Sequence, residues 1–265
     1  MGDWLAAVLV GLASGVLSGM FGIGGGILTT PAIRLLLDAP ALIAVGTPLP
    51  VIIPGALTGA SSYVRRGEAD VPSGLVIGVS GAATAVMGAW ATKLVGGPVV
   101  LLGTAALIVW AAADMTLQTL RTRSEPSPEE GEARRPHTDA TMSGLIRPVA
   151  IGLLAGAYSG FFGLGGGFVI VPLLTRWLRH PIKRAIGTSL VAVSVLAVPG
   201  TISHALLGNV DWSIAGPLAL GVVPGAFLGA RVNAAANDRT TRVAFVALLL
   251  ASAAWLAVTE LGALL

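Results

Sequence analysis

Two glycine-rich segments carry the groups in this sequence that are best suited to binding chemistry. They read SGMFGIGGGILTTP from Ser18 to Pro31 and SGFFGLGGGFVIVP from Ser159 to Pro172. A glycine-rich turn exposes backbone N–H groups, and a helix that follows it directs the positive end of its dipole at the same point. The pattern therefore predicts two anion-binding turns that converge on one site. The expected binding groups are backbone N–H groups of Gly24, Gly25, Gly26, Gly165, Gly166 and Gly167.

Hydroxyl side chains at matched positions could add further donors. Thr47 and Thr188 stand near the start of the next apolar block in each half, where a hydroxyl can cap a helix or donate to a bound oxyanion. Ser18 and Ser159 open the two glycine segments and could donate as well. Serine on a face of small residues also serves simply to pack helices, so both interpretations of these serines stay open.

Three further positions could carry charge. His204 lies in an apolar block, where it could hold a proton near a transport path or could be structural and hydrogen-bonded. Arg65 and Arg66 could attract anions to a cytoplasmic mouth, although arginines beside a membrane usually anchor topology. Asp114 lies toward one end of its apolar block, so we expect no carboxylate proton relay at the membrane centre.

The two glycine segments belong to a long internal repeat. Residues 11–49 and 152–190 align without a gap at an offset of 141 positions, and 17 of the 39 aligned residues are identical. The same offset later pairs Asp70 with Asp211. A repeat of this length predicts two related halves. We divide the chain into a first membrane repeat over residues 1–120, a polar linker over 121–147 and a second membrane repeat over 148–265.

Composition indicates a membrane environment. Charged residues make up 11% of the chain and apolar residues 54%, whereas soluble domains are about 25% charged. Backbone groups cannot stay unpaired in hydrocarbon, and the apolar blocks lack an alternating strand pattern, so the fold class is an all-α polytopic membrane protein. Four apolar blocks are expected in each half, at residues 4–37, 41–64, 72–95 and 98–120, then 148–178, 182–207, 212–232 and 243–264. The chain has no cysteine, and its three histidines show no ligand spacing, so no metal site is expected.

The first block of each half is too long for one crossing. Residues 4–37 would form a helix of about 51 Å, whereas the hydrocarbon core is about 30 Å thick. The glycines predict a break, with a new helix starting near Ile27 and its twin near Phe168. Close helix packing through small residues is the alternative explanation of these glycines.

Charge distribution predicts the topology. If each broken block enters and leaves on the same side, the halves are inverted, and 14 of the 16 Lys and Arg residues share one side; only Arg34 and Lys93 lie on the other. Four crossings per half would instead divide the charges nine to seven. The positive-inside rule favours the inverted arrangement, with both termini outside and the linker in the cytoplasm. Inverted repeats with broken helices are typical of secondary transporters, whose substrate site lies near the midplane.

The repeated motifs resemble one known family. The FGIGGG and FGLGGG turns, each followed by Pro31 or Pro172, and the later segments AVGTPL (44–49) and AIGTSL (185–190) resemble the TauE/SafE family, also called the sulfite exporter or TSUP family. The resemblance covers nearly the entire chain. It implies a transporter of the bacterial inner membrane that exports small sulfur-containing anions such as sulfite, sulfoacetate or related organosulfonates.

Other functions are weaker alternatives. Another small organic or inorganic anion could be the substrate, and the chain could be a membrane subunit that transports nothing. An intramembrane hydrolase would need Ser159 as nucleophile and His204 as base, but Ser18 has no matching histidine in its own half. We therefore expect no enzyme activity and no cofactor. The expected partners are a small sulfur oxyanion or sulfonate and the lipid bilayer, without nucleic acid, and a homodimer is left open.

Overall fold

The computed structural model describes residues 2–36, 39–94, 103, 106, 109–117, 142–163 and 165–264. Helices account for nearly all of these residues, and no strand occurs among them. The first half contributes α1 (Gly2–Phe21), α2 (Gly26–Leu36), α3 (Ala41–Gly46), α4 (Pro48–Arg65), α5 (Val71–Ala91) and the short 3-10 helix η1 (Thr92–Leu94). The second half contributes α7 (Met142–Phe162), α8 (Gly167–Trp177), α9 (Ile182–Leu206), α10 (Trp212–Ala235) and α11 (Asp238–Leu264).

Six stretches of the described helices are long and apolar enough to cross a membrane. They are residues 4–21, 41–65, 71–91, 145–162, 182–206 and 212–235, and α8 is a shorter apolar helix. This architecture confirms the expected all-α membrane fold. The expected block at 98–120 falls largely outside the described residues, and the one at 243–264 lies within α11.

The halves exchange partners in a reciprocal way. α1 of the first half packs along α10 of the second, and α7 of the second half packs along α5 of the first. Both contacts depend on glycines, because a Cβ on Gly19 would collide with the backbone of Ala226, and one on Gly160 would collide with that of Ala85. These two contacts are related by the repeat offset, since Gly160 matches Gly19 and Ala226 matches Ala85. Small residues thus let the backbones approach closely, as membrane bundles favour.

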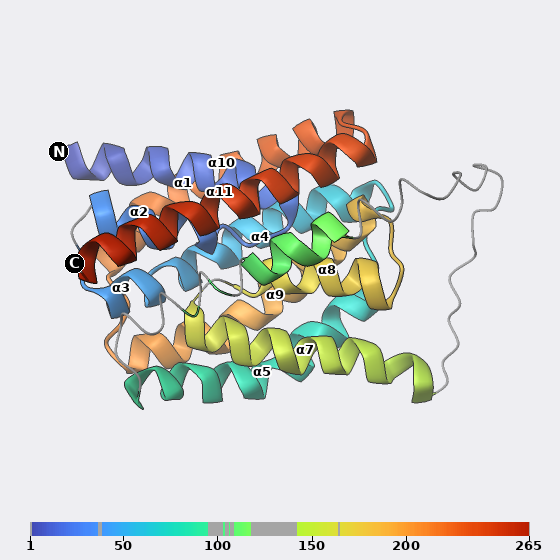
Figure 1. Cartoon of the computed structure of the whole chain (residues 1–265), viewed down its shortest axis with the longest axis horizontal. Coiled ribbons are helices and arrows are strands. Elements are labelled where there is room, and N and C mark those ends of the chain that lie inside the picture. The colour runs from blue at the N-terminus through green and yellow to red at the C-terminus, as the bar shows by residue number, and fades with distance from the viewer. Residues whose placement is uncertain are drawn as a thin grey trace.

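The matched helices α4 and α9 pack against each other at the centre and run in opposite directions (Figure 1). Gly59 of α4 faces Leu190 near the start of α9, whereas Leu49 near the start of α4 faces Gly200 of α9. A Cβ on Gly59 would lie 2.9 Å from Leu190 Cδ1, and one on Gly200 would lie 3.6 Å from Leu49 Cδ1. The labelled N and C ends of the chain lie at the same end of the bundle in Figure 1.

The first block of each half is broken where the glycines predict. α2 starts at Gly26 and α8 at Gly167, each one residue before the expected position. A Cβ on Gly25 would lie 3.7 Å from Ser18 Cβ in α1, so the chain doubles back beside α1 after the break. This return, rather than helix packing alone, explains why glycine is needed in the turn.

Two expected boundaries differ from the structure. α7 begins at Met142, so residues 142–147 of the expected linker are helical, and residues 121–141 of that linker fall outside the described part. The single block expected from residue 41 is two helices, α3 and α4, separated at Thr47. Pro48 has no N–H to continue a helix, whereas its twin Ser189 lies within the continuous helix α9.

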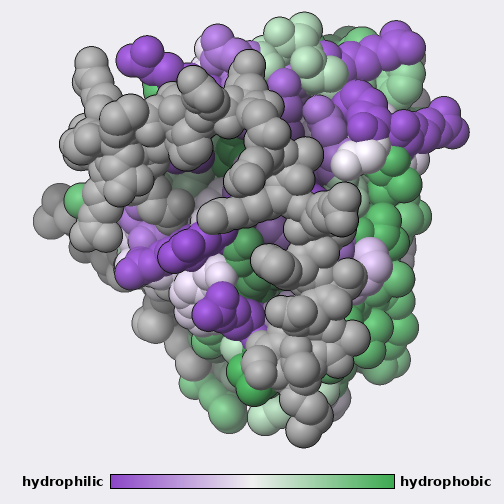
Figure 2. Space-filling view, turned by 90° about the vertical axis from the view of Figure 1, so that its right-hand side faces the viewer, coloured by the Kyte–Doolittle hydropathy of each residue, from purple (hydrophilic) through white to green (hydrophobic). Residues whose placement is uncertain are grey.

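Basic side chains gather at one end of the bundle, which Figure 2 shows as a hydrophilic face bordered by hydrophobic flanks. At this end α4 and α8 finish, with Arg65 and Arg176 in their last turns, and α9 begins, with Lys183 in its first turn. The flanks expose large apolar side chains, including Val79, Met87 and Leu220. A polar end and apolar sides suit a protein embedded in lipid.

Candidate functional site

The two glycine turns have the same backbone conformation. Positive φ angles occur at Gly22, Gly24 and Gly25 (71°, 77° and 84°) and at the matched glycines 163, 165 and 166 (68°, 75° and 72°). Residues other than glycine are strained at these positive φ angles. The conformation, and not composition alone, therefore accounts for the repeated glycines.

The turns meet at the centre of the protein. A Cβ on Gly24 would lie 3.9 Å from Gly165 Cα, and one on Gly167 would lie 2.8 Å from Ile23 Cα. All of these residues are buried. The structure thus brings together two segments that are 141 positions apart in the sequence, and with them the starts of α2 and α8.

Hydrogen-bond donors without partners surround this meeting point. In the described part of the chain, the backbone N–H groups of Gly24, Gly25, Gly165 and Gly166 donate no hydrogen bond. Each turn is also flanked by a serine whose buried hydroxyl has no partner there, Ser18 in α1 and Ser159 in α7.

These serines lie beside the turns. A Cβ on Gly25 would be 3.7 Å from Ser18 Cβ, and one on Gly166 would be 3.4 Å from Ser159 Cβ. Buried donors are normally bonded, so unbonded donors beside a helix start make these turns candidates for binding an acceptor. Gly26 and Gly167 begin the helices whose dipoles point at this site. The arrangement can bind an anion through neutral donors.

The two threonines connect the halves. Thr47 Oγ1 accepts a hydrogen bond from the backbone N–H of Asp211 (3.0 Å), and Thr188 Oγ1 accepts one from that of Asp70 (2.9 Å). Neither hydroxyl caps a helix start, because α4 has no side-chain cap at Thr47 and Thr188 lies inside α9. The capping interpretation is therefore wrong, and a role in anion binding stays a prediction.

The aspartates in these contacts cap the next helices. Asp70 precedes α5 and accepts from Ser73 N, and Asp211 precedes α10 and accepts from Ser213 N. The hydrogen bond from the Ser213 hydroxyl lowers the pKa of the Asp211 carboxyl. Each threonine thus fixes the start of a capped helix in the opposite half.

Sequence reasoning missed two hydroxyls that hold the turns in place. Ser189 Oγ donates to the carbonyl of Gly22 (2.8 Å) and lies 3.4 Å from the carbonyl of Gly167, so it bridges both turns. Ser14 Oγ donates to the carbonyl of Gly25 (2.8 Å). The repeat concealed both, because proline matches Ser189 and alanine matches Ser14 in the other half. The remaining signal in the sequence was the position of each serine within an apolar block.

His204 is fully buried and has contacts at both ring nitrogens. Its Nε2 lies 2.8 Å from the Gly160 carbonyl, and its Nδ1 lies 3.4 Å from Asn209 Nδ2. A carbonyl needs a donor and an amide NH₂ can supply one, so a neutral imidazole with its proton on Nε2 satisfies both contacts. The structure thus places His204 in a hydrogen-bonded position against Gly160, near the end of α7.

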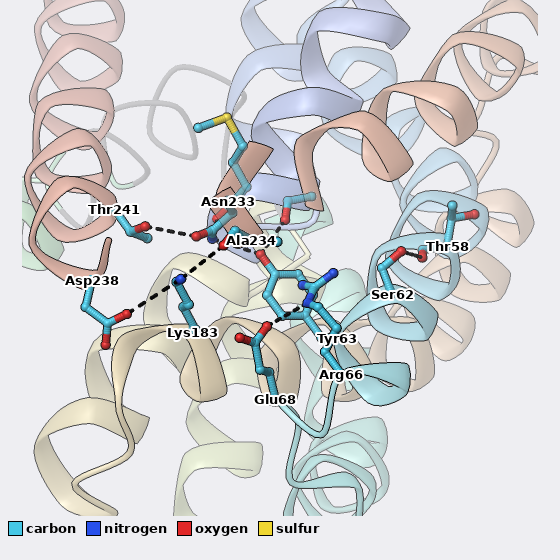
Figure 3. Close-up of polar contacts among 12 residues, drawn as sticks. Thr58, Ser62, Tyr63, Arg66, Glu68, Lys183, Asn233, Ala234, Asp238 and Thr241 are labelled. Atoms are coloured by element: carbon cyan, nitrogen blue, oxygen red, sulfur yellow. Dashed lines mark hydrogen bonds and ion pairs between the residues drawn. The ribbon is translucent and has the colours of Figure 1, made fainter. Parts of the chain in front are cut away.

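The predicted arginines lie at the basic end of the bundle. Arg65 is exposed, while Arg66 pairs with Glu68 (2.8 Å) and stacks over the Tyr63 ring at 4.5 Å (Figure 3). Asp114 is buried and pairs with Arg176 at 2.5 Å. Attraction of anions by Arg65 and Arg66 stays a prediction.

Asn233 organises the neighbouring polar network in Figure 3. Its amide donates to the Tyr63 hydroxyl (2.8 Å) and to the Met20 carbonyl, and its oxygen accepts from Thr241 (2.9 Å). The network joins α1, α4, α10 and α11. In the part of the chain that the structure describes, no group of three metal-ligating side chains occurs.

Comparisons with known proteins agree on one family. The family model described as "Sulfite exporter TauE/SafE" matches residues 7–256. The chain is 27% identical to the probable membrane transporter protein YunE of Bacillus subtilis (strain 168), over 89% of each chain. It is 33% identical to a probable membrane transporter protein of Xylella fastidiosa (strain 9a5c), over 83% of this chain and 80% of that one. No solved structure gives a significant match.

Proposed function

Because the chain belongs to the sulfite exporter TauE/SafE family of membrane transporters, we propose that it carries a small sulfur-containing anion, sulfite or an organosulfonate, out of the cytoplasm. The observation that carries this proposal is the convergence of two helix starts with unbonded donors. Among the described residues, the N–H groups of Gly24, Gly25, Gly165 and Gly166 donate no hydrogen bond, the two turns approach each other, and each turn lies beside a buried serine hydroxyl without a partner. Such donors suit the negative oxygens of a sulfur anion.

The donors at the turns suit the moderate binding strength that a transporter needs. N–H and hydroxyl groups are neutral, and their hydrogen bonds to an anion are weaker than an arginine clamp would provide. A carrier must release its load after each cycle, so moderate binding favours turnover. Thr47 and Thr188 belong to the proposed set as further hydroxyl donors, and their oxygens accept hydrogen bonds from backbone N–H groups of the opposite half.

We further propose that the halves are inverted repeats that alternate access around the turns. The antiparallel packing of α4 on α9 and the doubling back of α2 beside α1 support this arrangement. The charge distribution supports termini outside and the basic end in the cytoplasm of a bacterial inner membrane. Outward movement of one negative charge is then favoured by about 2.3 kcal/mol per 100 mV of inside-negative potential.

The same geometry supports transport without catalysis. A hydrolase would need an imidazole free to take a proton from Ser159, but both ring nitrogens of His204 have other contacts, with Gly160 and Asn209. We therefore propose that the chain moves its substrate unchanged.

Glycine substitutions in proteoliposomes test the proposal. Gly25→Ala and Gly166→Ala put a methyl 2.7 Å from Ser14 Oγ and 3.0 Å from the Ala155 carbonyl, inside the site. Gly67→Ala and Gly208→Ala are matched controls, because their φ angles are also positive (72° and 73°) but nothing lies within 4 Å of the new methyl. All four substitutions carry the same backbone strain, roughly 1–2 kcal/mol.

We expect flux of sulfite or sulfoacetate at a set membrane potential to be lost at least 10-fold in the first pair and kept in the control pair. Fluxes of thiosulfate and of a carboxylate, measured in the same way, test which class of anion the protein carries. Normal flux in Gly25→Ala and Gly166→Ala would remove the site from the glycine turns.

A further inference from the structure

Two apolar side chains are shared by both glycine turns. Ile52 of α4 and Val193 of α9 are matched by the repeat offset, and they are 2% and 0% exposed. A Cβ on Gly24 would lie 3.0 Å from Val193 Cγ1 and 3.3 Å from Ile52 Cγ2. One on Gly165 would lie 2.9 Å from Ile52 Cδ1 and 3.5 Å from Val193 Cγ1. Each side chain therefore touches the turn of its own half and that of the other half.

This position gives the site two chemically different sides. The turns and the serines supply hydrogen-bond donors, and the methyl groups of Ile52 and Val193 supply hydrocarbon. An anion bound between the two turns must contact these methyl groups or displace them. An oxygen that faces a methyl group loses its hydrogen bond to water and gains none in return.

Inorganic sulfur oxyanions and organic sulfonates meet this surface differently. Sulfite carries polar oxygens and a lone pair around a small centre, so part of its polar surface would face hydrocarbon. A sulfonate directs its three oxygens to one side and its carbon substituent to the other. Only the sulfonate matches donors on one side and methyl groups on the other.

We infer that Ile52 and Val193 determine substrate specificity, and that they select an organosulfonate with a short apolar substituent over inorganic sulfur oxyanions. The inference rests on the proposed function, because it assumes that the turns bind the substrate anion. The two side chains differ in size by one methylene, and each offers only hydrocarbon to the turns.

Substitutions at these two positions test the inference with the full-length protein in proteoliposomes. The measured quantity is the ratio of initial fluxes for sulfite, ethanesulfonate and butanesulfonate. In the wild type, the initial flux of ethanesulfonate should exceed that of sulfite. Val193→Thr keeps the shape of the side chain but adds a hydroxyl, and should raise the ratio of sulfite to ethanesulfonate about 10-fold. Ile52→Ala removes three carbons, and should raise the ratio of butanesulfonate to ethanesulfonate by a similar factor, about 10-fold.

Val191→Thr and Val191→Ala are the matched controls. Val191 lies on the same helix and is 7% exposed, but it faces Gly74 of α5. A Cβ on Gly74 would lie 2.9 Å from Val191 Cβ. These variants should keep wild-type flux ratios. Thermal shifts of the detergent-purified variants with each anion provide a second readout for any variant that reconstitutes poorly, and should change in the same order as the fluxes.

The outcomes separate the two proposals. Shifted ratios in the Ile52 and Val193 variants, with unchanged ratios in the Val191 controls, support the inference. Unchanged ratios in all variants, together with lost flux in Gly25→Ala, overturn the inference and leave the proposed function standing. A wild type that carries none of the three anions overturns the inference, and one that also carries no sulfoacetate overturns the proposed function as well.

Discussion

Tyr63 and His204 occupy matched positions of the two halves and make the same hydrogen bond with different chemistry. The Tyr63 hydroxyl donates to the Gly19 carbonyl in α1 at 2.9 Å, and His204 Nε2 lies 2.8 Å from the Gly160 carbonyl in α7. Gly160 is the repeat partner of Gly19. α4 and α9 thus each contact a carbonyl near the end of α1 or α7, through a tyrosine in one half and a histidine in the other.

This equivalence predicts a structural role for His204. His204→Gln keeps an N–H that can reach Gly160, and should retain both flux and the wild-type dependence of flux on pH. His204→Ala removes the contact with the buried Gly160 carbonyl and should lower the free energy of unfolding by about 1–3 kcal/mol. Flux in proteoliposomes between pH 5 and 8 is the measurement. A pH profile that becomes flat in His204→Gln would instead show that the imidazole carries a proton during transport.

The threonines that join the halves should contribute to stability. Thr188→Val removes the acceptor of the Asp70 N–H, and Thr47→Val removes that of the Asp211 N–H. Each change should cost about 1–3 kcal/mol in chemical unfolding of the detergent-solubilised protein, because a partly buried donor loses its partner. Thr47→Ser and Thr188→Ser retain the hydroxyl and are the controls. Equal losses in the Val and Ser variants would mean that the methyl group, and not the hydrogen bond, matters.

Local sequence was sufficient to predict the turns but not their surroundings. The positions where α2 and α8 begin were predicted within one residue, because three consecutive glycines in an apolar block leave few other conformations. The partners of Thr47 and Thr188 could not be predicted, since each lies more than one hundred positions away in the other half. Ser189 was missed because the repeat comparison favours matched residues, and proline stands at its twin position.

We predict that the contact between His180 and Asp70, which joins the two halves, is sensitive to acid. It lies between α8 and α9, 3.6 Å from the Asp70 carboxylate, and the same carboxylate is 3.8 Å from Arg184. Burial lowers the pKa of His180 below its usual value; Asp70 opposes this shift, and Arg184 adds to it. The folded protein therefore binds a proton at this site less readily than the unfolded chain does.

Stability should follow from that difference in proton binding. The contribution of His180 is fully favourable above the unfolded pKa of about 6.5 and is lost as the pH falls from there toward the lowered folded value. His180→Gln cannot take up a proton and should reduce the loss of thermal stability between pH 7 and pH 5. An unchanged loss of stability in His180→Gln would assign the acid sensitivity to other groups.

Cysteine labelling can test the orientation of the halves, because the native chain contains no cysteine. Gly67 and Gly208 are matched by the repeat offset, and both are exposed, with no atom within 4 Å of an added Cβ. Gly67 follows α4 at the basic end, whereas Gly208 follows α9 at the opposite end, since α4 and α9 run in opposite directions.

In intact cells, a membrane-impermeant maleimide should label Gly208→Cys and spare Gly67→Cys. Permeabilised cells, in which both should react, are the control. Labelling of both variants in intact cells would mean that the halves are parallel, and labelling of Gly67→Cys alone would mean that the whole protein has the opposite orientation.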